Sequence, residues 1–323
     1  MGNSTYIKLM KTLAEFQAVY HQPLPELMFQ AAEVHRANRT PGDVQRCALL
    51  SIKTGGCPED CGYCSQSARY KTPVEREPLL SVEEVKIRAR EALDRGATRF
   101  CMGAAWRSPK DGPDFDAVIE MVREVRSLGM EACVTLGMLS ADQATRLKEA
   151  GLTAYNHNLD TSRRYYPEVI TTRTYDDRLE TLRHVAKAGI SVCCGGIVGM
   201  GETEDDRLML LVELANLDTP PESVPINCLM PVQGTPLQMA PPVDSIELVR
   251  LIATARIAFP NARVRLSAGR DRMSKELQIL CFLAGADSVF FGEKLLTAGN
   301  PDEDADAAMF RSMGLPVPTS CSA

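Results

Sequence analysis

The sequence lacks any apolar run long enough to cross a membrane. No stretch approaches the roughly 18 consecutive apolar residues of a transmembrane helix, and the first residues carry Lys8, Lys11, Glu15 and His21 instead of the apolar core of a signal peptide. An excess of basic residues is also missing, because 36 Lys and Arg stand against 42 Asp and Glu, a net charge of −6. These absences argue against a membrane protein and against a dedicated nucleic-acid binder. We expect a cytoplasmic protein that acts on a small molecule.

Histidine is scarce, with four residues, whereas cysteine is plentiful, with eleven. In a cytoplasmic chain so many cysteines are not expected to form structural disulfides. They are therefore candidates for metal ligands, reactive thiols or small core residues. Hydrophobic residues make up 45% and charged residues 24% of the chain, a balance typical of a globular protein with a large core.

Short apolar runs alternate with longer amphipathic runs from about Cys47 onward, which predicts eight strand–helix units. The expected strands are Cys47–Ile52, Arg99–Ala104, Glu131–Leu136, Ala154–Asn158, Ser191–Val198, Ser223–Leu229, Arg263–Ser267 and Ser288–Phe291. The expected helices are Ser81–Arg95, Asp114–Leu128, Ser140–Ala150, Thr174–Ala188, Glu204–Asn216, Ser245–Phe259, Ser274–Ala284 and Glu303–Met313. Eight such units without a break favour a closed (β/α)8 barrel of the TIM type over an open sheet.

The barrel is expected to span residues 46–315. Residues 1–45 form an N-terminal helical extension, in which a helix at Leu24–Asn38 would plug or flank the bottom of the barrel. Residues 316–323 form a C-terminal tail. The proline-rich stretch 230–243 is expected to be a long loop inside the barrel domain.

Three cysteines follow the first strand with C-x3-C-x2-C spacing: Cys57, Cys61 and Cys64. Three thiolates can hold a [4Fe–4S] cluster and leave one iron open to a ligand, whereas an electron-carrying cluster normally uses a fourth cysteine. Zinc is the main alternative, but structural zinc takes four ligands and no histidine lies near this loop in the sequence.

Three further cysteines fall within expected strands: Cys101, Cys133 and Cys193. Side chains that point inward from different strands of a barrel can meet, so these thiols could surround one buried metal centre. Cysteine is also a common core residue, so each could equally be inert. Cys194 follows Cys193 directly, and only one of the two should point inward.

The cysteine loop, together with the glycine-rich segment 195–202, resembles the radical S-adenosylmethionine (SAM) superfamily. Within it, the segments 99–106, 128–137 and 192–196, which contain the three strand cysteines, resemble the biotin synthase family. The segments 220–227 and 291–297 match that family too. The resemblance runs from about Asp43 to the eighth strand.

This resemblance implies sulfur insertion that converts dethiobiotin to biotin, which makes the chain a sulfurtransferase. It implies a [4Fe–4S] cluster on Cys57, Cys61 and Cys64, at which SAM is cleaved to methionine and a 5′-deoxyadenosyl radical. It implies an auxiliary [2Fe–2S] cluster, which supplies the sulfur, on Cys101, Cys133, Cys193 and Arg265. The loop cysteines and Arg265 are the expected catalytic residues. The implied SAM-binding residues are Tyr63, Asn158, Asp160, Arg178, Gly195, Ile197, Gly199 and Glu202, and the implied substrate-binding residues are Asn158 and Asn227.

Several of these residues also have a possible structural role in place of the functional one. Arg265 could pair with a carboxylate, Asn158 and Asp160 could form a turn, and Arg178 could make a surface ion pair. The remaining cysteines are interpreted as packing or surface residues: Cys47, Cys194, Cys228, Cys281 and Cys321.

The competing functions are another barrel-type radical SAM mutase or maturase without sulfur insertion, and a non-catalytic iron–sulfur electron carrier. For the main hypothesis we expect an electron donor such as flavodoxin or ferredoxin and a homodimer. No nucleic-acid or membrane partner is expected.

Overall fold

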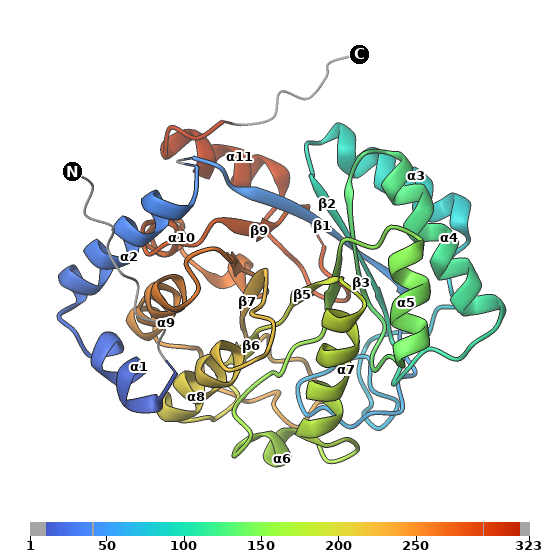
Figure 1. The fold of residues 1–323 in the computed structure, drawn as a ribbon, viewed down its shortest axis with the longest axis horizontal. Coiled ribbons are helices and arrows are strands. Elements are labelled where there is room, and N and C mark those ends of the chain that lie inside the picture. Colours follow the sequence, from blue (N-terminus) through green and yellow to red (C-terminus); the bar gives the residue numbers. More distant parts are fainter. Residues whose placement is uncertain (1–10, 41, 293, 317–323) are drawn as a thin grey trace.

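The computed structural model describes residues 11–40, 42–292 and 294–316. Within these ranges, nine parallel strands form one sheet in the order β5-β4-β3-β2-β1-β9-β8-β7-β6, and an additional β5–β7 pairing closes the ring. The strands are β1 (Gln45–Lys53), β2 (Arg99–Ala104), β3 (Glu131–Thr135), β4 (Ala154–Asn156), β5 (Ser191–Cys193), β6 (Gly196–Val198), β7 (Ser223–Cys228), β8 (Arg263–Leu266) and β9 (Ser288–Phe290). Because β5 and β6 occupy one position in the ring, the predicted eight-stranded closed barrel is confirmed (Figure 1).

The prediction of a continuous fifth strand over Ser191–Val198 is wrong. The strand is interrupted at Cys194 and Gly195, where the chain approaches β7 so closely that a Cβ on Gly195 would lie 1.9 Å from the carbonyl oxygen of Pro225. The fourth strand also ends early, at Asn156. Soon after it, Asp160 takes a left-handed conformation with φ 67°, which an extended strand cannot include.

Helices surround the barrel (Figure 1). They are α3 (Val82–Asp94), α4 (Pro113–Ser127), α5 (Ala141–Glu149), α6 (Tyr166–Val169), α7 (Tyr175–Lys187), α8 (Glu204–Ala215), α9 (Ser245–Ala258), α10 (Lys275–Leu283) and α11 (Glu303–Ser312), with a short 3-10 turn at Arg270–Arg272. Capping boxes start α3 at Ser81 and α5 at Ser140, which explains why these starts could be predicted. The short α6 was not expected. None of the helices in the described ranges is long and apolar enough to cross a bilayer.

The N-terminal extension contains two helices, α1 (Leu13–Tyr20) and α2 (Leu24–Asn38), of which only α2 was predicted. They pack on the outside of α8 and α9 and so flank the barrel instead of plugging it (Figure 1). Phe16 and Tyr20 are buried in this contact. Residues 1–10 and 317–323, with Cys321, lie outside the described residues.

One fully buried carboxylate, Asp287, joins the extension to the barrel just before β9. It pairs with Arg39 at 2.9 Å, with Arg256 at 2.9 Å and with Arg263 at 3.4 Å, and it accepts the amide of Val264 at 2.9 Å. Three guanidinium groups therefore converge on a single buried charge, and Asp43 is a second partner for Arg263 alone among them.

We expect Asp287→Ala to lower the free energy of unfolding by about 3–5 kcal/mol, because it leaves the fully buried Arg256 without its counter-charge. Urea unfolding followed by circular dichroism measures this. Asp43→Ala is the control, since Asp43 pairs with Arg263 near the surface and its loss should change stability by less than about 1 kcal/mol. Equal effects of the two substitutions would contradict the role given to Asp287.

Candidate functional site

A cavity of about 290 Å³ lies inside the barrel at the carboxyl ends of the strands, where barrel enzymes place their active sites. Among the residues predicted for the site, the following line it: Tyr63, Cys64, Cys101, Cys133, Asn158, Asp160, Ile197, Asn227 and Arg265. The cavity thus joins one thiol of the cysteine loop to two of the three predicted strand thiols, and Cys228 at the end of β7, which was interpreted as packing, also borders it. Much of the remaining wall is apolar, including Leu49, Leu229 and Met230, as in pockets for small organic ligands.

The cysteine loop is held compact by its own backbone. The amide of Cys64 donates to the carbonyl of Cys61 at 2.9 Å, and the amide of Ala68 donates to the carbonyl of Cys57 at 2.7 Å. Burial raises the pKa of all three thiols, and the neighbouring thiols raise it further for Cys61 and Cys64, to about 12 for Cys64. Arg173 donates from Nη2 to the sulfur of Cys61 at 3.6 Å, which places a positive charge beside the thiol set.

Two acidic residues inside the loop fix it to the segment after α6. The carboxylate of Asp60 accepts the amides of Thr171 at 2.9 Å and Thr172 at 3.2 Å. Burial alone would raise the pKa of Asp60, but these hydrogen bonds outweigh it and lower the pKa to about 2. Glu59 is buried and pairs with Arg107 at 2.7 Å.

The strand thiols meet inside the barrel, as predicted. Cys101 and Cys133 are register partners on β2 and β3 and pack together. Cys193, on β5, is close enough to change the pKa of Cys133. All three are buried, with exposed fractions of 4% or less. Cys194 packs instead into the main hydrophobic core, so Cys193 is the inward one of the pair.

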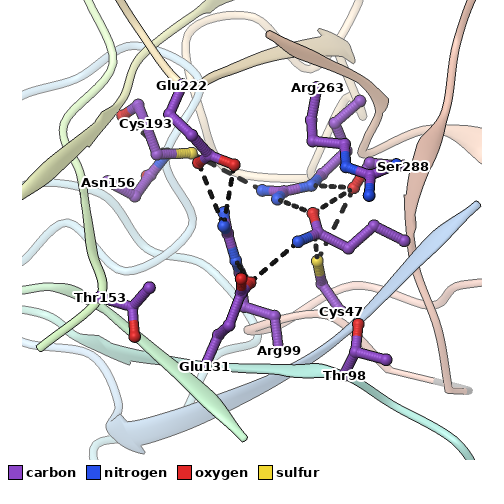
Figure 2. A network of polar contacts seen from close by, with 12 residues as sticks. Cys47, Thr98, Arg99, Glu131, Thr153, Asn156, Cys193, Glu222, Arg263 and Ser288 are labelled. Atoms are coloured by element: carbon purple, nitrogen blue, oxygen red, sulfur yellow. Dashed lines mark hydrogen bonds and ion pairs between the residues drawn. The ribbon is translucent and has the colours of Figure 1, made fainter. Parts of the chain in front are cut away.

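Two buried guanidinium groups flank the strand thiols. Arg265 donates from Nε to Ser288 at 3.0 Å and from Nη1 to the sulfur of Cys193 at 3.7 Å, and no carboxylate of the described residues lies within ion-pair distance of it. Arg99 pairs with Glu131 at 2.7 Å and Glu222 at 3.1 Å (Figure 2). Its Nη1 is buried without a hydrogen-bond partner among the described residues.

These charges act on Cys193. The neighbouring Cys133 thiol and the positive charges of Arg265 and Arg99 together outweigh burial and lower the pKa of the Cys193 thiol to about 7. Asn156 adds a further donor, 3.3 Å from the same sulfur. Cys193 is therefore the thiol in this set that most readily becomes a thiolate, the form that binds metal.

The donor sets fit iron–sulfur clusters better than single ions. In the described chain, no group of three or more Cys, His, Asp or Glu side chains is spaced to hold one metal ion. Ligands of a multi-iron cluster stand farther apart, around the irons and sulfides together. An iron–sulfur cluster is anionic and needs thiolate ligands and nearby hydrogen-bond donors. The strand site offers three thiols, two adjacent guanidinium groups and one buried N–H without a partner among the described residues.

A second polar group follows β4. Tyr63 donates its hydroxyl to Asp160 Oδ2 at 2.7 Å, and burial together with Asp160 raises the pKa of Tyr63, so this hydroxyl stays protonated. Arg178 is buried and donates to Asp160, to the carbonyl of Asn158 and to Tyr166. Arg178 thus holds Asp160 in place from behind the cavity wall.

The glycine-rich segment forms a shelf under these residues. A Cβ on Gly196 would lie 2.7 Å from the carbonyl oxygen of Asp160, so glycine permits the close approach. Glu202 accepts the amides of Gly199 at 2.8 Å and Met200 at 2.7 Å, which shapes the turn after β6. Asn227 donates to the carbonyl of Gly196 at 2.9 Å and so joins the shelf to β7.

Several predicted residues lie behind the cavity lining: Cys57, Cys61, Arg178, Cys193, Gly195, Gly199 and Glu202. Sequence reasoning also missed residues. Asn156 and Arg99 were not singled out, and Cys47 was interpreted as packing. The period-2 alternation on β1 could have found Cys47, since it lies two residues before Leu49, which lines the cavity.

Comparisons with known proteins place the chain among described families. The radical SAM superfamily matches residues 51–214, and the Biotin and Thiamin Synthesis associated domain matches residues 225–316. The biotin synthase of Methylorubrum extorquens (strain PA1) is 63% identical over 95% of this chain and 92% of its own length. That of Gloeobacter violaceus is 59% identical over 96% and 97%.

Solved structures share the fold. Methylornithine synthase (PylB) matches with a TM-score of 0.81 over 96% of this chain and 95% of its own, at 18% identity. The FeFe-hydrogenase maturase HydG from Carboxydothermus hydrogenoformans matches with a TM-score of 0.79 over 97% and 76%, at 19% identity. At such low identity these matches show the barrel fold alone.

We expect Asp60→Asn to loosen the cysteine loop, because an amide accepts the Thr171 and Thr172 amides more weakly than a carboxylate does. Loss of roughly 1.5 kcal/mol of charge-assisted hydrogen bonding should speed local amide exchange about tenfold in residues 57–68. Hydrogen exchange read by mass spectrometry measures this. The control is Asp94→Asn at the end of α3, which should leave the loop unchanged, and unchanged exchange in the Asp60 variant would refute the bracing role.

Proposed function

Because the chain belongs to the biotin synthase family of the radical SAM superfamily, we propose that it inserts sulfur into dethiobiotin to form biotin, with an auxiliary [2Fe–2S] cluster as the sulfur source. The observation that carries this proposal is the single cavity lined by Cys64 of the loop and by Cys101 and Cys133 of the strands. A radical-generating centre and a sulfur donor have to reach the same substrate, and here both thiol sets border one space.

Cys57, Cys61 and Cys64 would hold the [4Fe–4S] cluster. When bound, that cluster supplies the electron that cleaves SAM to methionine and a 5′-deoxyadenosyl radical. Arg173, beside Cys61, offsets the negative charge of the thiolates. Burial of the loop keeps these thiolates out of bulk water. Cys64 is the one of the three that borders the cavity, so a cluster bound here would face the cavity at Cys64.

Asp160 and Asn158 would orient SAM beside the loop. Asp160 offers a carboxylate to a ribose hydroxyl, and Tyr63 and Arg178 fix that carboxylate. Ile197, on the glycine shelf next to Asp160, gives the adenine an apolar surface. Gly195, Gly199 and Glu202 act by shaping the shelf. Because Arg178 already donates to Asp160, Asn158 and Tyr166, it would act on SAM through Asp160.

Cys101, Cys133, Cys193 and Arg265 would hold the auxiliary [2Fe–2S] cluster. When bound, that cluster supplies the sulfur atom that bridges the two activated carbons. Arg265 is oriented for this role by Ser288. Arg99 lies beside the same thiols and is itself paired with Glu131 and Glu222.

Asn227 and Asn158 would bind the cyclic urea of dethiobiotin. An asparagine amide can accept from a urea N–H and donate to a urea carbonyl without bringing charge into the pocket. Asn227 already uses one donor on Gly196 and accepts the amide of Ala268, which fixes its orientation and leaves a further donor and acceptor position. The apolar wall around Leu229 and Met230 suits the hydrocarbon part of the substrate.

We further propose the organisation and partners expected from the sequence. Residues 1–45 form a helical extension, residues 46–315 the catalytic barrel and residues 316–323 a tail. The enzyme works in the cytoplasm as a homodimer and takes electrons from a flavodoxin or ferredoxin. A radical SAM mutase or maturase without sulfur insertion is the alternative function, and the buried thiols of β2, β3 and β5 favour sulfur insertion over it.

We expect Cys57→Ala to abolish SAM cleavage with any reductant, because the loop cluster loses one of its three ligands. Cys133→Ala should instead abolish biotin formation and still cleave SAM slowly, because it removes a ligand of the other set. Anaerobic assays that measure 5′-deoxyadenosine and biotin together, with iron and acid-labile sulfide counted, separate the two.

Cys281→Ala is the matched control, since Cys281 is buried on α10 outside the barrel and should retain both products. Normal 5′-deoxyadenosine formation by the Cys57 variant would refute the radical SAM site. Biotin formed at the unmodified rate by the Cys133 variant would refute the auxiliary cluster as sulfur source.

A further inference from the structure

A fourth thiol, Cys47, lies in the same inner wall as the three strand thiols. It is fully buried and packs against Cys101 and Cys133. Three of the thiols therefore lie together on the inner faces of β1, β2 and β3, and Cys193 lies across from them on β5 beside Arg265. Cys47, Cys101, Cys133 and Ala154 make up a packing cluster of their own, separate from the main hydrophobic core.

Cys47 and Arg265 lie against the same two side chains. The Cys47 thiol is 3.5 Å from Gln45 Oε1 and 3.7 Å from Ser288 Oγ. Arg265 donates to that same Ser288 oxygen at 3.0 Å and to that same Gln45 oxygen at 3.4 Å. Figure 2 shows Cys47 directed toward Ser288, on the side of the barrel where β1 and β9 are paired. The thiol and the guanidinium thus approach one region of the auxiliary site from neighbouring strands.

We propose that Cys47 is a reserve ligand of the auxiliary cluster, whose thiolate binds iron when Arg265 does not. This inference rests on the proposed function, because it requires a two-iron cluster on Cys101, Cys133 and Cys193. Such a cluster takes four ligands, two for each iron, and the inner wall offers three of the proposed thiols and then either Arg265 or Cys47.

Ligand chemistry favours the exchange. A thiolate is soft and anionic and is a common ligand of iron–sulfur clusters, whereas a guanidine is a poor ligand that is normally protonated. In the exchange, the nitrogen–iron bond breaks and a sulfur–iron bond forms. The proton released by the Cys47 thiol goes to the freed guanidine, which becomes a guanidinium. The net charge of the buried site does not change, so the step requires no electron donor, oxidant or counter-ion.

Full-length variants reconstituted anaerobically with ⁵⁷Fe test the proposal, because Mössbauer spectra count two-iron and four-iron clusters separately. Cys47→Ser alone should keep the two-iron cluster, because Arg265 is present. Arg265→Ala alone should keep at least about half of it, with Cys47 as fourth ligand and the proton of its thiol released to solvent during reconstitution. The double variant Arg265→Ala/Cys47→Ser should retain less than about a tenth, since serine keeps the hydrogen bonds to Gln45 and Ser288 but is a poor ligand of iron in such clusters.

The matched control is Arg265→Ala/Cys281→Ser, which removes a buried cysteine outside the barrel and should behave like Arg265→Ala. A normal four-iron count in every variant shows that the barrel is folded. The reduction potential of the two-iron cluster in Arg265→Ala should also be lower than in the unmodified chain, because a thiolate replaces a neutral ligand.

The outcomes distinguish this inference from the proposed function. An Arg265→Ala variant that loses the two-iron cluster completely, or a double variant that keeps it, overturns the role of Cys47 and leaves the proposed function standing. If the unmodified chain takes up no two-iron cluster, the proposed function itself fails, and the reserve ligand fails with it.

Discussion

Closure of the parallel ring is the constraint on which the site depends. The ring closes where β5 pairs with β7, and that pairing requires Gly195, since a side chain there would overlap Pro225. Once the ring is closed, alternate residues of every strand point to one interior. Register then decides which of them meet: Leu49, Cys101 and Cys133 are successive partners across three strands. Because the strands are tilted in a closed barrel, register partners on successive strands follow one another around the inner wall. Cysteines far apart in sequence therefore become neighbours.

Much of this could be predicted from the sequence, because strand and helix periodicity and cysteine spacing are local signals. Alternation on single strands sufficed to expect Cys101 and Cys133 inside a closed barrel. The break in the fifth strand could not be predicted, since the approach of Gly195 to Pro225 joins segments that only the tertiary fold brings together. The same holds for Arg178, whose partners include Tyr166 on a short helix that was not expected.

Buried charge is arranged in two levels along the barrel. Toward the amino-terminal end of the strands, Arg99 is paired with Glu131 and Glu222, so its own charge is largely compensated (Figure 2). Arg265 has no carboxylate within ion-pair distance among the described residues, and its positive charge is therefore directed at the thiols. A buried guanidinium without a carboxylate is costly unless an anionic group completes the site. This asymmetry is a physical reason to place the anionic cluster beside Arg265 and to treat Arg99 as its support.

The two thiol sets differ in how they are held, and a chain of hydrogen bonds connects them. The loop thiols depend on braces such as Asp60, whereas the inner thiols stand on strands that cannot move without opening the barrel. Between the two sets, Arg178 joins Asp160 to the carbonyl of Asn158. The amide of Asn156 in turn contacts Asn158 Oδ1 at 3.2 Å and the sulfur of Cys193 at 3.3 Å. Side chains at the end of one strand therefore fix the position of the proposed SAM-binding carboxylate relative to the proposed sulfur donor. A radical that forms at one centre and is quenched at the other requires such a fixed distance between the two.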